Sequence, residues 1–153
     1  TRTCRWAARS TASGGCACTT RARTEIKKQL FYSGYIDNQD LAALYNTAFT
    51  FLYPSLRESF GIPILEAMAC GTPVITSHTS AMPEVAGEGA VLINPEQPQH
   101  IADALIKLEN DADFYQKQVD YVLERVKLFS WRNTAEAYSK IYREIQKKQS
   151  LET

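Results

Sequence analysis

The sequence has few of the residue types that mark a metal centre or an activated nucleophile. Only two histidines and four cysteines occur among its 153 residues. Cys4, Cys16 and Cys18 lie near one another, but no second close pair and no nearby histidine complete a zinc-binding pattern. A Walker loop is absent, and so is a serine nucleophile elbow. We therefore expect no metal centre, no P-loop nucleotide hydrolysis and no serine-hydrolase triad.

Net charge and long apolar runs are lacking as well. The chain carries 17 basic and 17 acidic residues, so its formal charge is zero and nothing favours binding to nucleic acid or to a membrane surface. No run reaches the ~18 apolar residues of a membrane span. The charge is nevertheless uneven, because residues 1–24 hold five arginines and no acid, and the remainder holds 12 basic and 17 acidic residues.

Residues 1–24 lack the features of a folded segment. They show no helical or strand periodicity, and Trp6 is nearly the only bulky apolar side chain among them. No continuous apolar stretch follows the arginines, so the segment does not resemble a signal peptide. We interpret residues 1–24 as a basic leader, disordered or foreign to the fold, and expect no strand there; a basic binding arm is the alternative. The folded domain is then expected at residues 25–153.

One stretch organises the rest of the chain. Phe51–Tyr53 is a short apolar run that is typical of a buried parallel strand. After a polar loop, Pro63 suits a first helical turn, and good helix formers fill Ile64–Cys70. Gly71 stands where a left-handed residue closes a helix, and Pro73–Thr76 contains the β-branched residues of a second strand. The pattern predicts a strand–helix–strand unit close to the minimum length of a parallel crossover.

A ligand-binding site is expected at the N-terminus of that helix. Its unpaired N–H groups and its dipole favour an anion, and Gly61 lets a ligand approach the backbone closely. Two carboxylates, Glu58 and Glu66, flank the same place. This combination suits a ligand with both phosphate and hydroxyl groups, since carboxylates accept hydrogen bonds from hydroxyls. The alternative is that Glu66 only complements the helix dipole and Glu58 is a solvated loop residue.

These residues carry a resemblance to a known family. Glu58 and Glu66 are separated by seven residues within ESFGIPILEAMACGTPVI, which resembles the E-x7-E region of the retaining GT-B glycosyltransferases of family four. LFYSGYIDNQDLAALYNTA before the motif, and SAMPEVAGEGAVLINP and FSWRNTAEAYSKIYREI after it, resemble further segments of that family in the same order. The likeness covers about Gln29 to Ile145 and leaves out the first two dozen residues.

The expected fold class is α/β. The resemblance implies a Rossmann-like parallel sheet with helices on both faces, an incomplete C-terminal half of a GT-B fold, with four strands and about six helices. Strands are expected at Gln29–Ser33 and Ala90–Ile93 besides the two of the central unit. In sheets of order 3-2-1-4-5-6, the first two strands lie between the third and the fourth. By resemblance those two are missing here, so we expect a marginally stable domain with Gln29–Ser33 poorly anchored.

Amphipathic patterns predict the helices around the central unit. Apolar residues at spacings of three and four give Asp40–Thr47 and Pro98–Leu108 one apolar face each. The pattern recurs at Tyr115–Val126 and at Trp131–Ile145. We expect the apolar face of the last helix to lie in the core; it consists of Trp131, Ala135, Tyr138, Tyr142 and Ile145.

The resemblance also implies roles for the site residues. Glu66 is expected to hold the ribose diol, and Glu58, as the catalytic residue, to meet hydroxyls of the donor sugar. Backbone near Tyr35 and Ile36 is expected to contact the nucleotide base, unless it is a plain strand-to-helix loop. Sugar or phosphate oxygens are expected at the backbone N–H groups of Ser59, Phe60, Gly61 and Ile62.

The implied function is that of a retaining glycosyltransferase in bacterial polysaccharide or glycan synthesis. Its donor is a nucleotide-diphospho-sugar, with a lean towards GDP-mannose, and no cofactor or metal is expected. Asp111 and Asp113 have the D-x-D spacing of metal-dependent glycosyltransferases of another fold, but they stand where a helix cap is ordinary.

This chain is expected to be the donor-binding portion, inactive alone. The Arg and Lys with which the family holds the diphosphate lie upstream of Gln29, and a missing N-terminal domain would bind a glycan or lipid-linked acceptor. The expected location is the cytoplasm, with peripheral association at the inner membrane face. A non-catalytic nucleotide-binding domain and a truncated remnant without activity are the alternatives.

Overall fold

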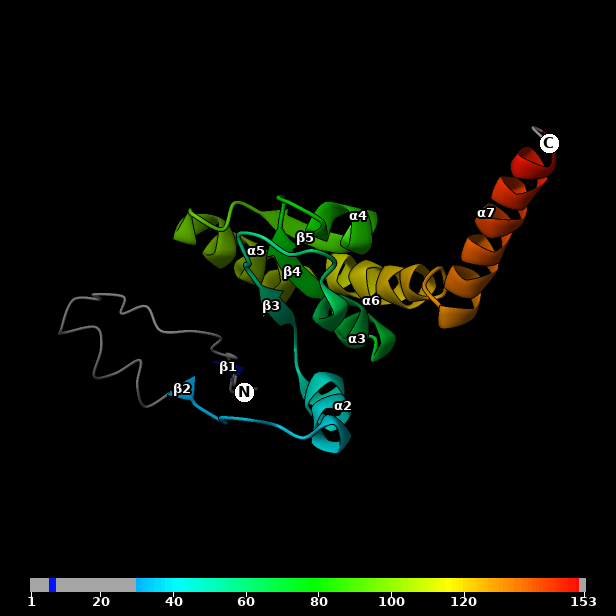
Figure 1. Ribbon diagram of the computed structural model, residues 1–153. Helices are drawn as coiled ribbons and strands as arrows, with labels where there is room; N and C mark the ends of the chain where they lie inside the picture. The colour runs from blue at the N-terminus through cyan, green and yellow to red at the C-terminus, as the bar shows by residue number, and fades with distance from the viewer. Residues whose placement is uncertain (1–5, 8–29, 152–153) are drawn as a thin grey trace.

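The computed structural model describes residues 6–7 and 30–151. Its main sheet has three parallel strands, in the order β3 (Phe51–Tyr53), β4 (Val74–Ser77) and β5 (Ala90–Ile93), and their first residues are paired in register (Figure 1). The predicted parallel sheet is therefore confirmed, with three strands in place of the four expected, and β3 forms one edge of it within the described residues.

The helices occur along the chain in the order that the sequence predicts. Most of them extend beyond their predicted bounds: the first by two residues at its N-terminus, the fourth by two at its C-terminus and the last by six. The N-terminal extension of the first arises because the carbonyl of Asp37 accepts hydrogen bonds from the N–H groups of Asp40 and Leu41, both at 3.0 Å. The helices are α2 (Asn38–Thr47), α3 (Ile62–Ala69), α4 (Met82–Ala86), α5 (Pro98–Asn110), α6 (Ala112–Val126) and α7 (Trp131–Leu151), and a 3-10 turn η1 (Gly87–Gly89) follows α4.

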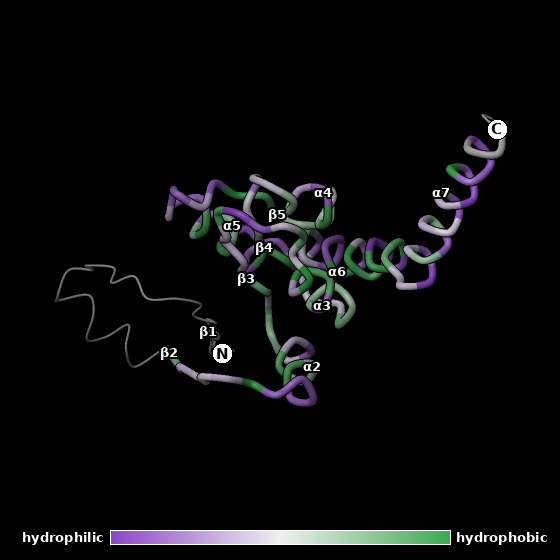
Figure 2. Tube along the Cα trace, in the orientation of Figure 1, coloured by the Kyte–Doolittle hydropathy of each residue, from purple (hydrophilic) through white to green (hydrophobic). Residues whose placement is uncertain are grey.

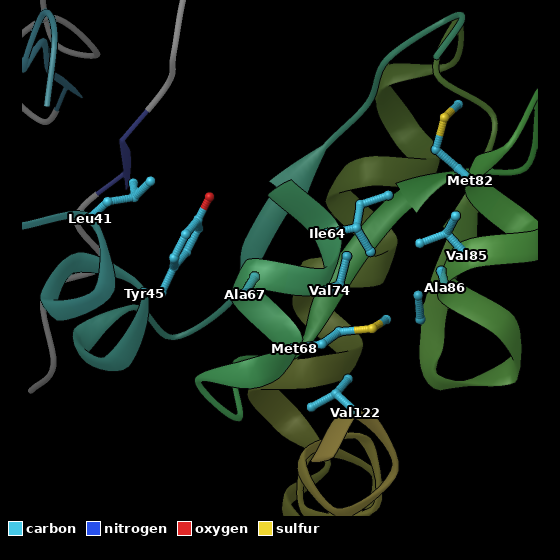
Figure 3. Packing of buried hydrophobic residues seen from close by; sticks show 11 residues of the cluster. Leu41, Tyr45, Ile64, Ala67, Met68, Val74, Met82, Val85, Ala86 and Val122 are labelled. Atoms are coloured by element: carbon cyan, nitrogen blue, oxygen red, sulfur yellow. The ribbon is translucent and has the colours of Figure 1, made fainter. Parts of the chain in front are cut away.

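Two hydrophobic clusters cover the two faces of the sheet. Val74 packs into the first cluster and its neighbour Ile75 into the second, because successive side chains of a strand point to opposite faces. The first cluster joins α2, α3, α4 and the C-terminal half of α6 (Figure 3). The second joins α5 to the start of α6. Helices thus lie on both faces, as predicted.

The crossover from β3 to β4 has the predicted form. Gly71 follows α3 with a φ of 71°, the left-handed conformation expected there. Thr72 then donates from Oγ1 to the carbonyl of Tyr45 at 2.7 Å, and Thr76 does the same to the carbonyl of Tyr53 at 2.9 Å. These bonds tie the start of β4 to α2 and its C-terminal half to β3.

A second, two-stranded parallel sheet corrects one expectation. β1 (Trp6–Ala7) pairs with β2 (Leu30–Phe31), so the expectation of no strand in residues 1–24 is wrong at these two positions. Strand pairing is made by backbone groups, and side-chain composition constrains a two-residue ladder only weakly. The rest of residues 1–24, together with Gln29, lies outside the described residues.

β2 does not join the main sheet, which agrees with the gap expected between the third and fourth strands of the family's order. The side chain of Leu30 is half exposed and that of Phe31 is largely exposed. Weak anchoring of this strand remains a prediction.

The last helix departs from expectation. α7 projects away from the sheet (Figure 1), and its apolar stripe is exposed: Trp131 by 87%, Tyr138 by 60% and Tyr142 by 65%. The prediction that this stripe lies in the core is wrong for the described residues. Periodicity fixes which side of a helix is apolar, but it does not say which partner covers that side.

The hydropathy pattern otherwise follows the architecture. Apolar segments gather in the strands and in the helices around the sheet (Figure 2). Within residues 6–7 and 30–151, no helix combines the length and the apolar character that crossing a membrane requires.

Candidate functional site

The loop between β3 and α3 carries the first candidate glutamate. Glu58 is half-buried, and two side chains hold one of its oxygens. Tyr53, the last residue of β3, donates from its hydroxyl to Oε1 at 2.6 Å, and Ser55 donates to the same oxygen at 3.1 Å. Such a short O–H···O⁻ distance is typical of a charge-assisted hydrogen bond. Both bonds end on Oε1, so Oε2 is the oxygen that can accept a hydrogen bond from a ligand hydroxyl.

The second candidate glutamate stands on α3. Glu66 is exposed, and its Oε2 accepts a hydrogen bond of 3.2 Å from the hydroxyl of Tyr45. Tyr45 lies on α2 and is only 6% exposed, so a largely buried ring presents its hydroxyl to an exposed carboxylate. Each of the two predicted glutamates is thus held by one tyrosine.

Three aromatic rings connect these two positions. Tyr45 meets Phe51 edge-on, with ring centroids 5.2 Å apart, and Phe51 stacks on Tyr53 at 5.6 Å. Such distances are favourable for aromatic pairs. The row Tyr45–Phe51–Tyr53 therefore links the partner of Glu66 to the partner of Glu58.

A second loop fixes the backbone of Glu58. Ser80 donates from Oγ to the carbonyl of Glu58 at 2.7 Å and accepts from its N–H at 3.3 Å. Beside it, Thr79 donates to the carbonyl of Leu56 at 3.1 Å. Ser80 has a φ of 57°, a left-handed conformation that is uncommon for a residue other than glycine. The loops after β3 and β4 are therefore fastened together beyond the carboxyl ends of both strands, where α/β sheets bind ligands.

The N-terminus of α3 carries the four backbone donors that the sequence predicts. Gly61 caps it with a φ of 98°, and a Cβ atom there would lie 3.1 Å from Cδ1 of Ile64. Among the described residues, none accepts a hydrogen bond from the backbone N–H of Ser59, Phe60, Gly61 or Ile62. These four donors are the ones that the sequence nominates, and they are available to a ligand.

The other two predicted residues are placed differently. Tyr35 is 86% exposed, and in the described part of the chain no hydrogen bond or ring contact connects it with the loop of Glu58. Ile36 packs against the first hydrophobic cluster. The structure therefore brings Glu58, Glu66 and residues 59–62 to one strand–helix unit and leaves Tyr35 at its periphery. A base contact near Tyr35 and Ile36 remains a prediction.

Sequence reasoning did not nominate the residues that hold the glutamates. Tyr53 and Ser55 precede Glu58 by five and three positions, so a search for hydroxyl groups near the motif would have found them. Tyr45 is assigned to the apolar face of its helix, and its hydroxyl carries no separate signal. Ser80 lies 22 residues from Glu58, and only the fold brings the two together.

The D-x-D pair has an ordinary structural role. Oδ1 of Asp111 accepts a hydrogen bond from the N–H of Phe114 at 2.9 Å, which is the predicted helix cap. In the part of the chain that the structure describes, no three His, Cys, Asp or Glu side chains gather in a group that could hold a metal ion.

Known protein sequences are similar to most of this chain. The family model described as "Glycosyl transferases group 1" matches residues 18–125, so the match begins before Gln29 and ends before α7. The serotype-specific mannosyltransferase WbdA of Escherichia coli is 39% identical over 109 residues, which are 71% of this chain and 13% of that protein. The O-antigen chain mannosyltransferase B of Escherichia coli is 39% identical over 102 residues, or 67% of this chain and 27% of that protein. The chain thus spans about a quarter or less of these curated relatives.

Solved structures agree on the fold. Sucrose-phosphate synthase from Thermosynechococcus elongatus matches with a TM-score of 0.73 and 29% identity, over 83% of this chain and 33% of that one. The C-terminal domain of a glycosyl transferase group 1 family protein from Francisella tularensis matches with a TM-score of 0.58 and 27% identity, over 71% and 64%. Anabaena HepE, solved with UDP-glucose, shares the fold with a TM-score of 0.64 and 24% identity, over 78% and 34%.

Proposed function

We propose, since the chain belongs to the glycosyl transferases group 1 family, that it forms the nucleotide-sugar-binding part of a retaining glycosyltransferase. The observation that carries this proposal is the arrangement at α3. Two carboxylates, each held by a tyrosine, stand on either side of a helix N-terminus whose N–H donors are available. A nucleotide-diphospho-sugar offers both hydroxyl and phosphate groups to such a site.

The proposed roles follow from the chemistry of each group. Glu66 accepts hydrogen bonds from the ribose diol, and Glu58 accepts them from hydroxyls of the transferred sugar. The N–H groups of residues 59–62 bind sugar or phosphate oxygens. The leaving diphosphate gains negative charge as the glycosidic bond breaks, so donors that are fixed beside it lower the barrier of the transfer.

The donor is proposed to be GDP-mannose. Support comes from the relatives, since both Escherichia coli proteins at 39% identity are mannosyltransferases by name. Anabaena HepE was solved with UDP-glucose, but at 24% identity that likeness supports the fold alone. A comparison of GDP with UDP on this chain therefore tests the base directly.

The acceptor, a glycan or a lipid-linked glycan, is proposed to bind to a part of the enzyme beyond this chain. The exposed apolar stripe of α7 supports this, because a stripe that includes Trp131, Tyr138 and Tyr142 is stabilised when another surface covers it. Action in the cytoplasm, at the inner membrane face, is part of the same proposal, and cell fractionation tests it.

The test is an NMR titration of the ¹⁵N-labelled 153-residue chain with GDP, GDP-mannose, UDP and UDP-glucose. We expect shift changes at the amides of Gly61 and Ile62, and tighter binding of the guanine nucleotides. Glu66→Gln should weaken binding of GDP and GDP-mannose roughly 10- to 150-fold, since each hydrogen bond to a charged group contributes ~1.5–3 kcal/mol. Glu58→Gln should weaken binding of GDP-mannose and leave binding of GDP unchanged.

Glu144→Gln is the matched control, because Glu144 is exposed on α7 and lies outside the proposed site. It should leave every dissociation constant unchanged. If none of the four nucleotides binds to the wild-type chain, the proposal is wrong. Binding that both site variants leave unchanged would mean that the nucleotide lies elsewhere.

A further inference from the structure

We propose that Tyr53 and Tyr45 are positioning residues, which set the carboxylates of Glu58 and Glu66 for the ligand. This inference rests on the proposed function and goes beyond it, because it assigns tasks to two side chains outside the E-x7-E motif. It also predicts that the two tyrosines act on different parts of the same ligand.

The contact of Tyr53 with Glu58 is the shorter of the two. The hydroxyl of Tyr53 lies 2.6 Å from Oε1, and Ser55 Oγ adds a second donor to the same oxygen at 3.1 Å. Two donors on one oxygen fix the rotation of the carboxylate. They leave Oε2 to accept a hydrogen bond from a sugar hydroxyl. A glutamate in a loop would otherwise exchange among rotamers and lose part of its binding energy in being ordered.

Tyr45, on α2, holds the carboxylate of Glu66 in the same way. Its ring is buried in the first hydrophobic cluster, and Thr72 holds its backbone carbonyl at 2.7 Å. The position of its hydroxyl is therefore determined by the core, while Glu66 itself is exposed. At 3.2 Å the bond is longer than that of Tyr53, so we expect the smaller effect here.

The row of aromatic rings connects the two tyrosines that hold the glutamates. Phe51 lies between the two tyrosines, 5.2 Å from the ring of Tyr45 and 5.6 Å from that of Tyr53. The two hydroxyls are thus separated by packed rings rather than by a loop. Packed aromatic side chains hold their positions more closely than exposed polar ones, so the row sets the separation of the two carboxylates.

The experiment removes each hydroxyl and keeps each ring. Tyr53→Phe should weaken binding of GDP-mannose roughly two- to tenfold and leave GDP unchanged, since Glu58 faces the sugar. Tyr45→Phe should weaken binding of GDP and binding of GDP-mannose by the same factor, at the lower end of that range, since Glu66 faces the ribose. Tyr142→Phe, at an exposed position of α7, is the matched control and should change neither.

A double-variant cycle separates positioning from a general structural effect. If Tyr53 acts through Glu58, Tyr53→Phe should have no further effect on GDP-mannose binding in the Glu58→Gln background. The corresponding cycle pairs Tyr45→Phe with Glu66→Gln. A role in stability alone would lower the melting temperature and weaken GDP and GDP-mannose equally in both backgrounds, and that result would overturn the inference.

Failure of this inference is distinguishable from failure of the proposed function. If the wild-type chain binds GDP-mannose and Glu58→Gln weakens it, the function stands. If Tyr53→Phe and Tyr45→Phe then bind like the wild type, the positioning roles are wrong. If the wild-type chain binds no nucleotide, the proposed function is overturned, and the positioning roles with it.

Discussion

Replacing Gly61 by alanine tests whether the entry into α3 depends on a residue without a side chain. With a φ of 98°, Gly61 lies beyond the region that L residues adopt readily, so strain of ~1–3 kcal/mol is expected. The new Cβ would lie 3.1 Å from Cδ1 of the fully buried Ile64, which must then move. Alanine also lowers the entropy of the unfolded chain, which offsets ~0.4–1 kcal/mol. We expect a net loss of about 2 kcal/mol in the free energy of unfolding.

Gly71→Ala is the matched control, because this residue follows the same helix with a φ of 71°. Its Cβ would meet Leu123 at 3.6 Å, an ordinary van der Waals contact. The loss should therefore be smaller, about 1 kcal/mol or less. Urea unfolding followed by circular dichroism measures both values. If Gly61→Ala costs no more than Gly71→Ala, the reasoning from the Cβ contact is refuted.

Three further predictions concern catalysis, metal and anchoring. In a complete enzyme, Glu66→Gln should mainly raise KM for the donor, since the ribose is remote from the bond that breaks. Glu58→Gln should instead lower kcat more than it raises KM. Steady-state kinetics that show the reverse pattern would exchange the two roles. Turnover in that enzyme should survive EDTA, and a loss that Mn²⁺ or Mg²⁺ restores would revive Asp111 and Asp113 as ligands. Hydrogen exchange should be fast across Gln29–Ser33, and strong protection there would contradict the expected weak anchoring of β2.

The central unit was predictable because local signals and tertiary contacts agree there. The apolar run Phe51–Tyr53 is β3 residue for residue, and Ala90–Ile93 is β5. Gly71 takes the left-handed conformation that its place after a helix requires. At such positions, propensity, hydrophobic pattern and turn chemistry all favour the same structure.

The features that the sequence did not predict correctly have a different physical origin. The stripe of α7 obeys helical periodicity, and periodicity predicts an apolar face without identifying its partner. β1 arises from backbone pairing over two residues, which leaves hardly any trace in composition. The hydrogen bond from Tyr45 to Glu66 joins residues 21 positions apart, so neither spacing nor propensity announces it.

The length of α7 has a mechanical consequence. Twenty-one residues at a rise of 1.5 Å form a rod of ~30 Å. Its base adjoins Phe129, whose ring meets that of Phe60 edge-on, with centroids 6.1 Å apart. Phe60 belongs to the loop whose N–H groups are the proposed phosphate donors. A rotation of the rod about this contact would therefore displace its far end much further than its base.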